Sequence, residues 1–500
     1  MKKRLLLGYD VGSSSIKASL LDAESGRTVA SAQSPDQEMK IEAPHAGWAE
    51  QHPELWWRHV IAATNRLLRT AKLREPEIQA IGISYQMHGL VMLGKKHEVL
   101  SPAIIWCDSR AVDTGSRAAA ALGEKFCLTH LLNTPGNFTA SKLRWVKENL
   151  PDVFRNVHRI MLPGDYVALR MTGQACTTVS GLSEGILWDF SEGRVARELL
   201  KYYGIDESVL PEIVPTFGAQ GVLGKKGAAE LGLPPGIPVA YRAGDQPNNA
   251  LSLNVLNAGD VAATAGTSGV VYGVTTENVA DAKGRVNTFA HVNYSVRRPV
   301  NGVLLCINGT GIQYSWVKKQ LGGNRRSYAD MNRMAGQVAI GAEGVLCFPF
   351  GNGAERVLEN LDVGGGFSGI NFNIHEERHL IRAAQEGIAF AFCYGLEVLN
   401  SMGIDVSIVR AGDSNLFQSG VFRDAFVNAC NLNLEIYNTD GSQGAARGAG
   451  IGIGLYSDKE AFRGLKVVKK TAPDARRVDR YGEIYRVWKK GLSELTQRKL

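Results

Sequence analysis

Hydrophobic residues at the start of the chain form short apolar runs that are separated by small polar residues. Residues 5–9 and 16–21 are mostly apolar, and residues 10–15 between them are mostly serine and glycine. Short apolar runs bounded by turn residues are typical of β-strands. The pattern therefore predicts a β-hairpin, followed by a third strand near Val29.

A similar strand, turn and strand recur in the second half of the chain. Residues 261–265 and 270–274 are strand-like, and the turn at residues 266–269 consists of glycine, threonine and serine. Small residues of this kind let backbone amides and hydroxyls approach phosphate oxygens closely. Two such turns that face one cleft could hold a triphosphate between two lobes, whereas each turn by itself is better interpreted as an ordinary surface hairpin.

Strand-like and helical segments alternate in the rest of the chain. Residues 81–84 and 237–243 predict strands, and residues 53–68 and 141–149 predict helices. In residues 376–402 the apolar positions recur near the helical period, which predicts one long helix. Mixed strands and helices in both halves indicate an α/β fold.

The length of 500 residues exceeds what one ordinary hydrophobic core can organise. We therefore expect two domains, residues 1–250 and 251–500, with the boundary after the helix that starts at Gln246. Hydrophobic residues make up 44% of the chain and charged residues 21%, as is typical of a globular protein. Because the sequence contains no run of about 18 apolar residues, we expect no membrane partner.

Charge and cysteine usage narrow the class of protein further. The formal net charge of +7 is modest and no helix or arm gathers a basic stripe, so we expect no nucleic-acid partner. The 7 cysteines are scattered and include no Cys-x-x-Cys pair, which argues against a disulfide framework and structural zinc. With no signal segment in the sequence, this composition predicts a cytoplasmic protein.

Two aspartates stand at the ends of predicted strands. Asp245 follows residues 237–243 and precedes Pro247, a setting that favours a helix N-cap. A carboxylate at the end of a strand and near a domain junction is also well placed to meet a ligand. Asp10 ends the first strand, where it could place Mg²⁺ next to phosphate or form an Asx-turn.

Amide, aromatic and carboxylate side chains follow two further apolar runs. Gln86, Met87 and His88 come after the strand at residues 81–84, and residues 106–110 include tryptophan, aspartate and arginine. These groups together suit a ligand with many hydroxyl groups. A single histidine is more often a structural residue than a ligand contact, so the segment points to a binding site only in combination with the others.

Taken in order, these segments resemble the motifs of the FGGY carbohydrate kinases over residues 6–454. The segments that carry the resemblance are residues 10–17, 47–53, 86–89, 138–145, 266–269, 309–313, 366–370 and 380–386. The Gln-Met-His-Gly segment at residues 86–89 is typical of the xylulokinase branch. Glycerol kinases carry a charged Arg-Glu pair there, so the resemblance disfavours glycerol as the substrate.

The resemblance implies a ribonuclease H-like fold of the actin/hexokinase type, with two domains and a central cleft for ATP and a sugar. It implies an ATP-dependent kinase of a ketopentose, with D-xylulose and its 5-phosphate as substrate and product. Ribulose, gluconate and other small polyols stay open as substrates, and so does a homodimer. Asp245 would be the general base at the terminal hydroxyl of the sugar, with an ordinary carboxyl pKa of about 4.

By the same resemblance, each group of site residues takes a role. Asp245 would be the catalytic base, and the sugar pocket would consist of Met87, His88, Trp106, Asp108, Asp245 and Gln246. The nucleotide would be bound by Gly12, Ser13, Ser14, Lys17, Gly266, Thr267, Ser268, Gly309, Gln313, Gly412 and Asn415. Mg²⁺ would be placed by Asp10 and Asp245.

The chain departs from the family pattern at several places. Residues 247–249 (Pro-Asn-Asn) replace the small residues that usually follow the catalytic aspartate, which affects the shape of the sugar pocket. The segment at residues 411–415 differs from the usual glycine-rich adenosine motif. Asn137 is inserted before one family motif and Gln385 replaces an apolar residue in another. We expect neither of these two residues to contact the reacting groups.

A different class of function is compatible with the same fold, namely a nonhydrolytic sugar sensor or an actin-like assembly protein. A sensor of the repressor kind would need a DNA-binding module, and the first predicted strand starts at residue 5. An actin-like polymer would not need Asp245 or the segment at residues 86–89. The combination of motifs therefore favours an enzyme.

Overall fold

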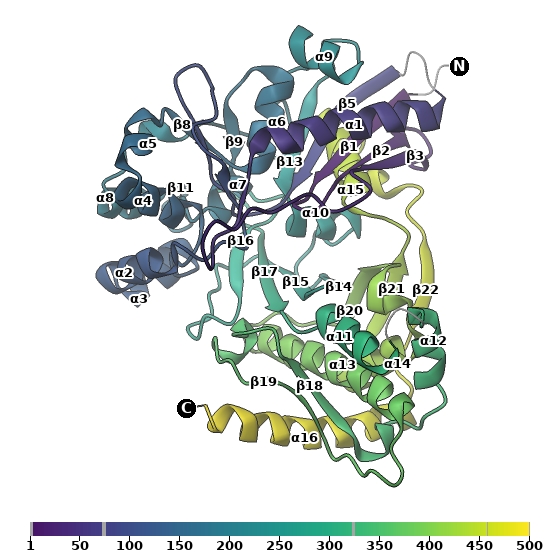
Figure 1. Ribbon diagram of the computed structural model, residues 1–500. Helices are drawn as coiled ribbons and strands as arrows, with labels where there is room; N and C mark the ends of the chain where they lie inside the picture. Colours follow the sequence, from purple (N-terminus) through teal and green to yellow (C-terminus); the bar gives the residue numbers. More distant parts are fainter. Residues whose placement is uncertain (1–3, 73–76, 323–325, 458, 500) are drawn as a thin grey trace.

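The computed structural model describes residues 4–72, 77–322, 326–457 and 459–499, and it contains two α/β lobes (Figure 1). The sheet of the first lobe has the strand order β13-β5-β1-β2-β3. Its strands are β1 (Arg4–Val11), β2 (Ile16–Asp22), β3 (Thr28–Ser34), β5 (Glu77–Tyr85) and β13 (Val239–Gly244). β1 pairs antiparallel with β2 and parallel with β5, so the predicted hairpin is confirmed and lies in the middle of the sheet.

The sheet of the second lobe repeats this plan and extends it, with the strand order β16-β17-β15-β14-β20-β21-β22. Its strands are β14 (Val261–Ala265), β15 (Gly269–Thr275), β16 (Asn287–Ala290), β17 (Asn301–Ile307), β20 (Ile408–Gly412), β21 (Asn433–Tyr437) and β22 (Val467–Thr471). The second predicted hairpin is β14-β15, and β14 pairs parallel with β20 as β1 does with β5. The strand, turn and strand that recur in the sequence therefore take equivalent places in the two sheets.

Helices cover the sheet of the first lobe and continue into a group at its side. They are α1 (Pro53–Ala71), α2 (Val112–Leu122), α4 (Thr139–Asn149), α5 (Pro151–Asn156), α6 (Pro163–Thr172), α7 (Val179–Glu184), α8 (Arg197–Tyr203), α9 (Lys225–Leu231) and α10 (Asp245–Ser252). α1 starts where the His52 side chain accepts the amide hydrogen of Glu54, and it ends at left-handed Lys72. Its apolar stripe, which includes Trp56 and Leu67, is buried in the core of this lobe.

The second lobe is organised around one long buried helix. Its helices are α11 (Gly311–Gly322), α12 (Tyr328–Ala335), α13 (Glu377–Ser401), α14 (Gly420–Cys430), α15 (Gly441–Gly452) and α16 (Ala475–Gln497). α13 packs against α14 and against the hairpin of β18 (Leu346–Phe350) and β19 (Gly364–Ser368). The helix predicted at residues 376–402 is confirmed, and its apolar positions Ile381, Ile388 and Leu399 are fully buried.

Helix α15 belongs to the second half of the chain but packs on the sheet of the first lobe (Figure 1). The contact requires glycine on the strands, because a Cβ atom at Gly8 would lie 1.9 Å from the carbonyl oxygen of Ser442. A Cβ atom at Gly82 would lie 2.0 Å from the carbonyl oxygen of Ala445. The two halves are therefore interlocked, and the boundary near residue 250 stays a prediction.

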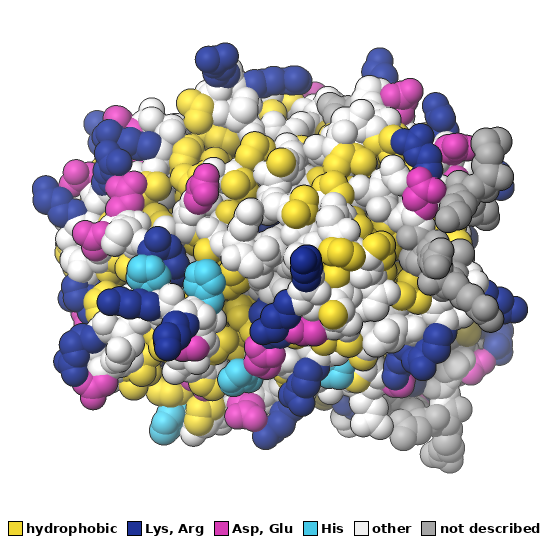
Figure 2. Space-filling view, turned by 90° about the horizontal axis from the view of Figure 1, so that it is seen from above, with side chains coloured by type: hydrophobic (Ala, Val, Ile, Leu, Met, Phe, Trp, Pro, Cys, Tyr) yellow, Lys and Arg dark blue, Asp and Glu magenta, His cyan; other side chains and the backbone are white. Residues whose placement is uncertain are grey.

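The outer surface carries charges of both signs. Figure 2, which views the molecule from above, shows basic and acidic side chains interspersed over this face. Within the ranges that the structure describes, no helix is both long enough and apolar enough to cross a membrane.

A buried ion pair holds the strand that leads to Asp245. The Nε of Arg242 on β13 lies 2.8 Å from Oδ1 of Asp165 on α6, and both side chains are almost fully buried. We expect Arg242→Met to lower the free energy of unfolding by about 3–5 kcal/mol, because it leaves the carboxylate of Asp165 without a counter-charge. Urea unfolding measures this loss, and the double variant Arg242→Met/Asp165→Asn should recover part of it. A loss below about 1 kcal/mol in the single variant would contradict a stabilising role for the pair.

Candidate active site

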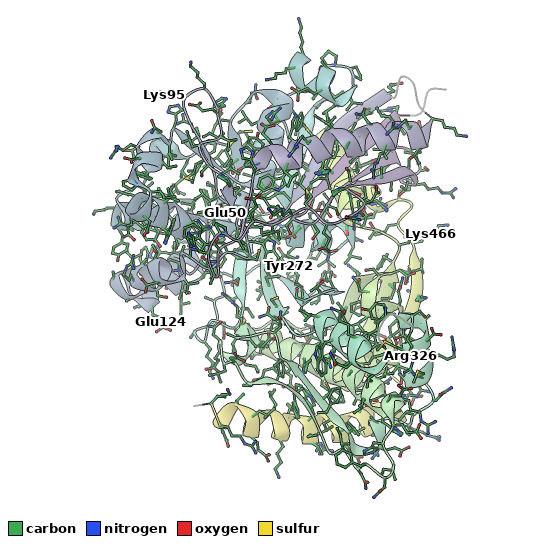
Figure 3. All side chains as sticks on the ribbon, in the orientation of Figure 1. Glu50, Lys95, Glu124, Tyr272, Arg326 and Lys466 are labelled. Atoms are coloured by element: carbon green, nitrogen blue, oxygen red, sulfur yellow. The ribbon has the colours of Figure 1, made fainter. Side chains whose placement is uncertain are left out.

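A cavity of about 550 Å³ lies between the two lobes. The predicted site residues that line it are Asp10, Gly12, Ser13, Ser14, Lys17, Met87, His88, Trp106, Asp245, Gln246 and Ser268. The other lining residues are Ser15, Gln86, Asn137, Phe138, Val270, Asn287, Leu304, Cys306 and Arg356. Side chains fill the junction beside it, where buried Tyr272 is labelled in Figure 3. Tertiary structure therefore brings together the turn at residues 10–15 (the first turn), the segment at residues 86–89 that is expected to contact the sugar (the sugar-side motif) and Ser268 of the turn at residues 266–269 (the second turn).

Asp10 lies at the carboxyl end of the central strand β1. Its Oδ1 accepts a hydrogen bond of 2.9 Å from the hydroxyl of Ser84 on the neighbouring strand. Burial raises the pKa of Asp10, and the positive charge of Lys17 opposes this shift. The first residue of α15 also abuts this carboxylate, because a Cβ atom at Gly441 would lie 2.5 Å from Oδ2.

Asp245 is the first residue of α10 and not its N-cap, which is Gly244. The local interpretation of Asp245 as a helix cap is therefore wrong. Burial raises the pKa of Asp245 to about 7, and the charge of Asp10 adds to the shift, against hydrogen bonds from the amides of Gln246 and Asp245. The expected ordinary pKa is also wrong, because the sequence does not reveal that the two carboxylates face one cavity.

His88 presents one ring nitrogen to a carbonyl and is neutral. Its Nδ1 lies 2.9 Å from the carbonyl oxygen of Glu184, which can only accept, so Nδ1 carries the proton and Nε2 is an acceptor. Burial, together with the charge of Lys142, lowers the pKa of His88 to about 3. The ring packs edge-on against Phe138 and lies near Phe289 of the second lobe. His88 can therefore accept a hydrogen bond from a hydroxyl group at any physiological pH.

The amino group of Lys142 holds the backbone on which this part of the cavity is built. Its Nζ donates to the carbonyl oxygens of His88 and Ile105, at 2.8 and 2.9 Å. Burial lowers the pKa of Lys142 to about 7. Lys142 belongs to the family-like segment at residues 138–145, and its contacts are with His88 and with Ile105, next to the segment at residues 106–110.

Trp106 and Asp108 are close in sequence but differ in their environment. Trp106 is half exposed, lines the cavity and donates from Nε1 to the hydroxyl of Ser13 at 3.3 Å. Asp108 does not line the cavity, although the sequence places it in the sugar pocket. Its buried carboxylate accepts the amide hydrogen of Ala49 at 2.6 Å and pairs with Arg110. Hydrogen bonds from Ala49 and Arg110 occupy both oxygens of this carboxylate, which indicates a structural role.

Asn137, which we expect not to contact the reacting groups, is part of the cavity lining. Its side-chain amide donates to the carbonyl oxygen of Asp108, and its Oδ1 accepts the amide hydrogen of Ala111 at 3.3 Å. In contrast, Asn248 of the unusual segment after Asp245 points away from the cavity. Its Nδ2 donates to the carbonyl oxygen of Gly441 at 2.8 Å, so it fastens α10 to α15.

Two further cavities lie on the second lobe. One of about 580 Å³ is lined by Gly266, Thr267 and Asn415, together with Gly311, Ile312, Tyr314, Ser315, Tyr328 and Asn332 among others. Another of about 420 Å³ is lined by Gly309 and Gln313 with Trp316 and the glycines at residues 364–366 among others. The turn at residues 266–269 separates the first of these cavities from the central one, because Ser268 lines the central cavity. Gly412 ends β20 and lines none of the three cavities.

Gln385 contributes to this lobe in a way that the sequence did not indicate. Its Nε2 donates to the hydroxyl of Tyr314 at 2.7 Å and to Oδ1 of Asn332 at 3.0 Å. Its Oε1 accepts from the hydroxyl of Ser419 at 2.6 Å. Gln385 does not reach the cavity, but it orients two side chains that line it. Only its polarity at a buried helical position could have pointed to this role.

Each lobe presents a glycine- and hydroxyl-rich turn near one cavity, which the carboxylates of Asp10 and Asp245 also line. This is the architecture of a two-lobed phosphotransferase. Residues 5–252 match the N-terminal domain of the FGGY family of carbohydrate kinases, and residues 261–452 match its C-terminal domain. The chain belongs to this family, and it is a carbohydrate kinase. The family resemblance and the two-domain fold of the actin/hexokinase type are therefore confirmed.

Several xylulose kinases are similar to this chain over nearly its whole length. That of Lactococcus lactis is 30% identical over 99% of this chain and 98% of that protein. That of Bacillus subtilis is 27% identical over 97% of this chain and 96% of that protein. The crystal structure of xylulose kinase from Rhodospirillum rubrum covers 98% of this chain and 99% of its own, with a TM-score of 0.87 and 25% identity. FGGY kinases use ATP as the phosphate donor.

Proposed function

We propose that this kinase transfers the γ-phosphate of ATP to the terminal hydroxyl of a ketopentose, converting D-xylulose to D-xylulose 5-phosphate. The nearly full-length similarity to xylulose kinases supports this choice of sugar. One observation carries the proposal: Asp245 and His88 of the first lobe line the same cavity as Ser268 of the second. A base, a hydroxyl-binding side chain and a phosphate-type turn meet there.

In the proposed reaction, Asp245 accepts the proton of the terminal hydroxyl while the hydroxyl oxygen attacks the γ-phosphorus. Neutral His88 offers Nε2 as an acceptor for another hydroxyl of the sugar, and Gln246 lines the cavity beside the base. Trp106, with Met87, packs against the carbon chain of the sugar. Ser13, Ser14 and Lys17 of the first turn and its flank contact the phosphate oxygens.

The carboxylates of Asp10 and Asp245 fit a divalent cation. Both line the central cavity, and the charge of Asp10 is one cause of the raised pKa of Asp245. Carboxylate oxygens are the ligands that Mg²⁺ prefers, together with water and phosphate oxygens. Bound Mg²⁺ would neutralise negative charge on the phosphate groups of ATP. We assign both aspartates to this ion, with Asp10 as the principal ligand because Asp245 must also take the proton.

We assign the nucleoside of ATP to the cavity lined by Gly266, Thr267 and Asn415, which adjoins the central one across the second turn. Gly309 and Gln313 line the third cavity, next to the start of α11. We keep both residues as proposed contacts of the nucleotide, which would then extend along the start of this helix. Gly412, at the end of β20, would act through the backbone of the segment that carries Asn415.

The proposal is tested by the release of ADP in the presence of a panel of acceptors. D-xylulose should stimulate release most strongly, with ribulose, gluconate and glycerol as the comparison set. A different preferred sugar would keep the kinase and correct its substrate. If the protein binds ATP but none of these acceptors stimulates ADP release, the proposed reaction is wrong and the alternative of a nonhydrolytic sensor gains support.

The role of Gln385 gives a separate prediction for the nucleotide side. Gln385→Leu should lower the free energy of unfolding by about 1–3 kcal/mol, because it removes the hydrogen bonds that Gln385 makes with Tyr314, Asn332 and Ser419. It should also raise the KM for ATP and leave the KM for the sugar unchanged. Urea unfolding and steady-state kinetics measure both effects, with the exposed Gln337→Leu as the control. An unchanged KM for ATP would show that Gln385 does not influence the binding of the nucleotide.

A further inference from the structure

Arg356 brings a positive charge from the second lobe to the sugar side of the central cavity. It starts the short helical turn Arg356–Leu358, whose Val357 and Leu358 are buried in the core of that lobe. The Arg356 side chain lines the cavity together with His88, Cys306 and Ser268. The guanidinium is close enough to His88 and to Cys306 to influence the pKa of each. It therefore lies between the sugar-side motif and the second turn.

The guanidinium of Arg356 has no acidic partner among the residues that the structure describes. Its one hydrogen bond is from Nη1 to Oδ1 of Asn287, at 2.8 Å. The buried Arg242 and Arg382 each pair with a carboxylate, and the buried Arg447 donates to three backbone carbonyls. A partly buried charge with most of its donors unused is costly unless a ligand completes it.

Contacts from both lobes hold Arg356 in place. The carboxylate of the preceding Glu355 accepts the amide hydrogen of Asn308 at 2.9 Å and so ties the turn to the segment before α11. Asn287, which accepts from Arg356, donates in turn to Oδ1 of Asn133 in the first lobe at 2.9 Å. The guanidinium is thus pre-positioned at the junction of the lobes, and its free donors can meet a ligand without a large rearrangement.

We propose that Arg356 is a catalytic residue that binds an oxyanion at the sugar end of the cavity, namely the phosphoryl group during transfer to the acceptor. The inference rests on the proposed kinase function. In that reaction the hydroxyl oxygen forms a bond to the γ-phosphorus, and the bond from this phosphorus to the bridging oxygen breaks. ADP leaves with the electron pair, and the hydroxyl proton passes to Asp245.

The chemistry of a guanidinium suits this role. Its planar donors form paired hydrogen bonds to phosphoryl or carboxylate oxygens, and such charge-assisted bonds are the strong ones. Asp245 and Arg356 line the same cavity from different lobes. In the proposed reaction Asp245 takes the proton of the attacking hydroxyl, and Arg356 stabilises the negative charge that develops on the phosphoryl oxygens. A carboxylate on the acceptor, as in gluconate, would present the same oxyanion chemistry from a second source.

The test compares Arg356→Gln and Arg356→Lys with the exposed surface variant Arg298→Gln. Steady-state kinetics are measured with neutral D-xylulose and with gluconate. We expect Arg356→Gln to lower kcat about 100-fold on every acceptor with little change in KM for the sugar, because one preorganised donor to a developing charge is lost. Arg356→Lys keeps the charge and should recover part of kcat.

The remaining outcomes are equally decisive. A rise of KM confined to gluconate would support the oxyanion site and assign its source to the acceptor. If kcat/KM of Arg356→Gln stays within about threefold of Arg298→Gln on both acceptors, the inference is overturned. If the wild-type protein phosphorylates neither sugar, the proposed substrate fails separately from this inference. Arg356 is then tested by thermal unfolding of the wild-type protein and Arg356→Gln with and without inorganic phosphate. A rise in Tm with phosphate in the wild-type protein alone supports the oxyanion site. Equal rises in the two proteins reject it.

Discussion

Asp245→Asn should lower kcat for sugar phosphorylation by about 10²- to 10⁴-fold, because an amide cannot take the proton of the attacking hydroxyl. The substitution keeps the size of the side chain at the first position of α10, so the fold and the binding of ATP should be preserved. Measurement of ADP release gives the rate, and calorimetric titration with ATP checks binding. Asp152→Asn is the matched control, because Asp152 also lies in the first turn of a helix but is exposed. Near-normal turnover of Asp245→Asn would remove Asp245 as the base.

The pH dependence of the wild-type enzyme should report the same carboxylate. With its pKa raised to about 7 by burial and by Asp10, Asp245 is protonated at lower pH and cannot act as a base. The value of kcat/KM should therefore rise with pH through this range, and added Mg²⁺ should move the rise to lower pH by opposing the charge of Asp10. The sign for stability is the opposite. A pKa raised on folding stabilises the protein at low pH, and this contribution is lost as the pH rises through about 7.

Asp10→Asn should raise the Mg²⁺ concentration for half-maximal turnover by at least about tenfold, since even residues that only support metal ligands have effects of this size. It should also lower the pH at which activity rises, because Asp10 no longer repels the charge of Asp245. Kinetics over a range of Mg²⁺ concentrations at fixed ATP measure the first effect. Ser84→Ala, which removes only the hydrogen bond to Oδ1 of Asp10, should shift the Mg²⁺ dependence less. Unchanged Mg²⁺ dependence in Asp10→Asn would separate Asp10 from the metal.

Much of the secondary structure could be predicted because its causes are local. The hairpins β1-β2 and β14-β15 follow from apolar runs on either side of small polar turns. The long helix α13 follows from apolar residues at the helical period, and its observed ends differ by one residue from the prediction. The first turn and the sugar-side motif could be assigned to a site because each follows a strand end and several such segments occur in a fixed order.

Residues whose role depends on a distant partner could not be assigned in this way. Asp108 resembles a binding residue in the sequence, but its carboxylate is occupied by Ala49 and Arg110. Arg356 starts a short helical turn, and nothing in its neighbourhood in the sequence indicates that it lines the same cavity as His88. Such pairings bring together segments that are far apart in the chain, so local patterns carry no record of them.

The sequence by itself determined the class of protein, the two hairpins and the identity of Asp245 as the best candidate for the base. Only the tertiary structure decided the electrostatic state of that carboxylate, because burial and the charge of Asp10 raise its pKa against the local hydrogen bonds from Gln246 and Asp245. The same holds for α15, which leaves the second half of the chain to pack on glycines of the first sheet. Hydrophobic pattern and turn chemistry act over a few residues, whereas charge, burial and helix packing are properties of the assembled lobes.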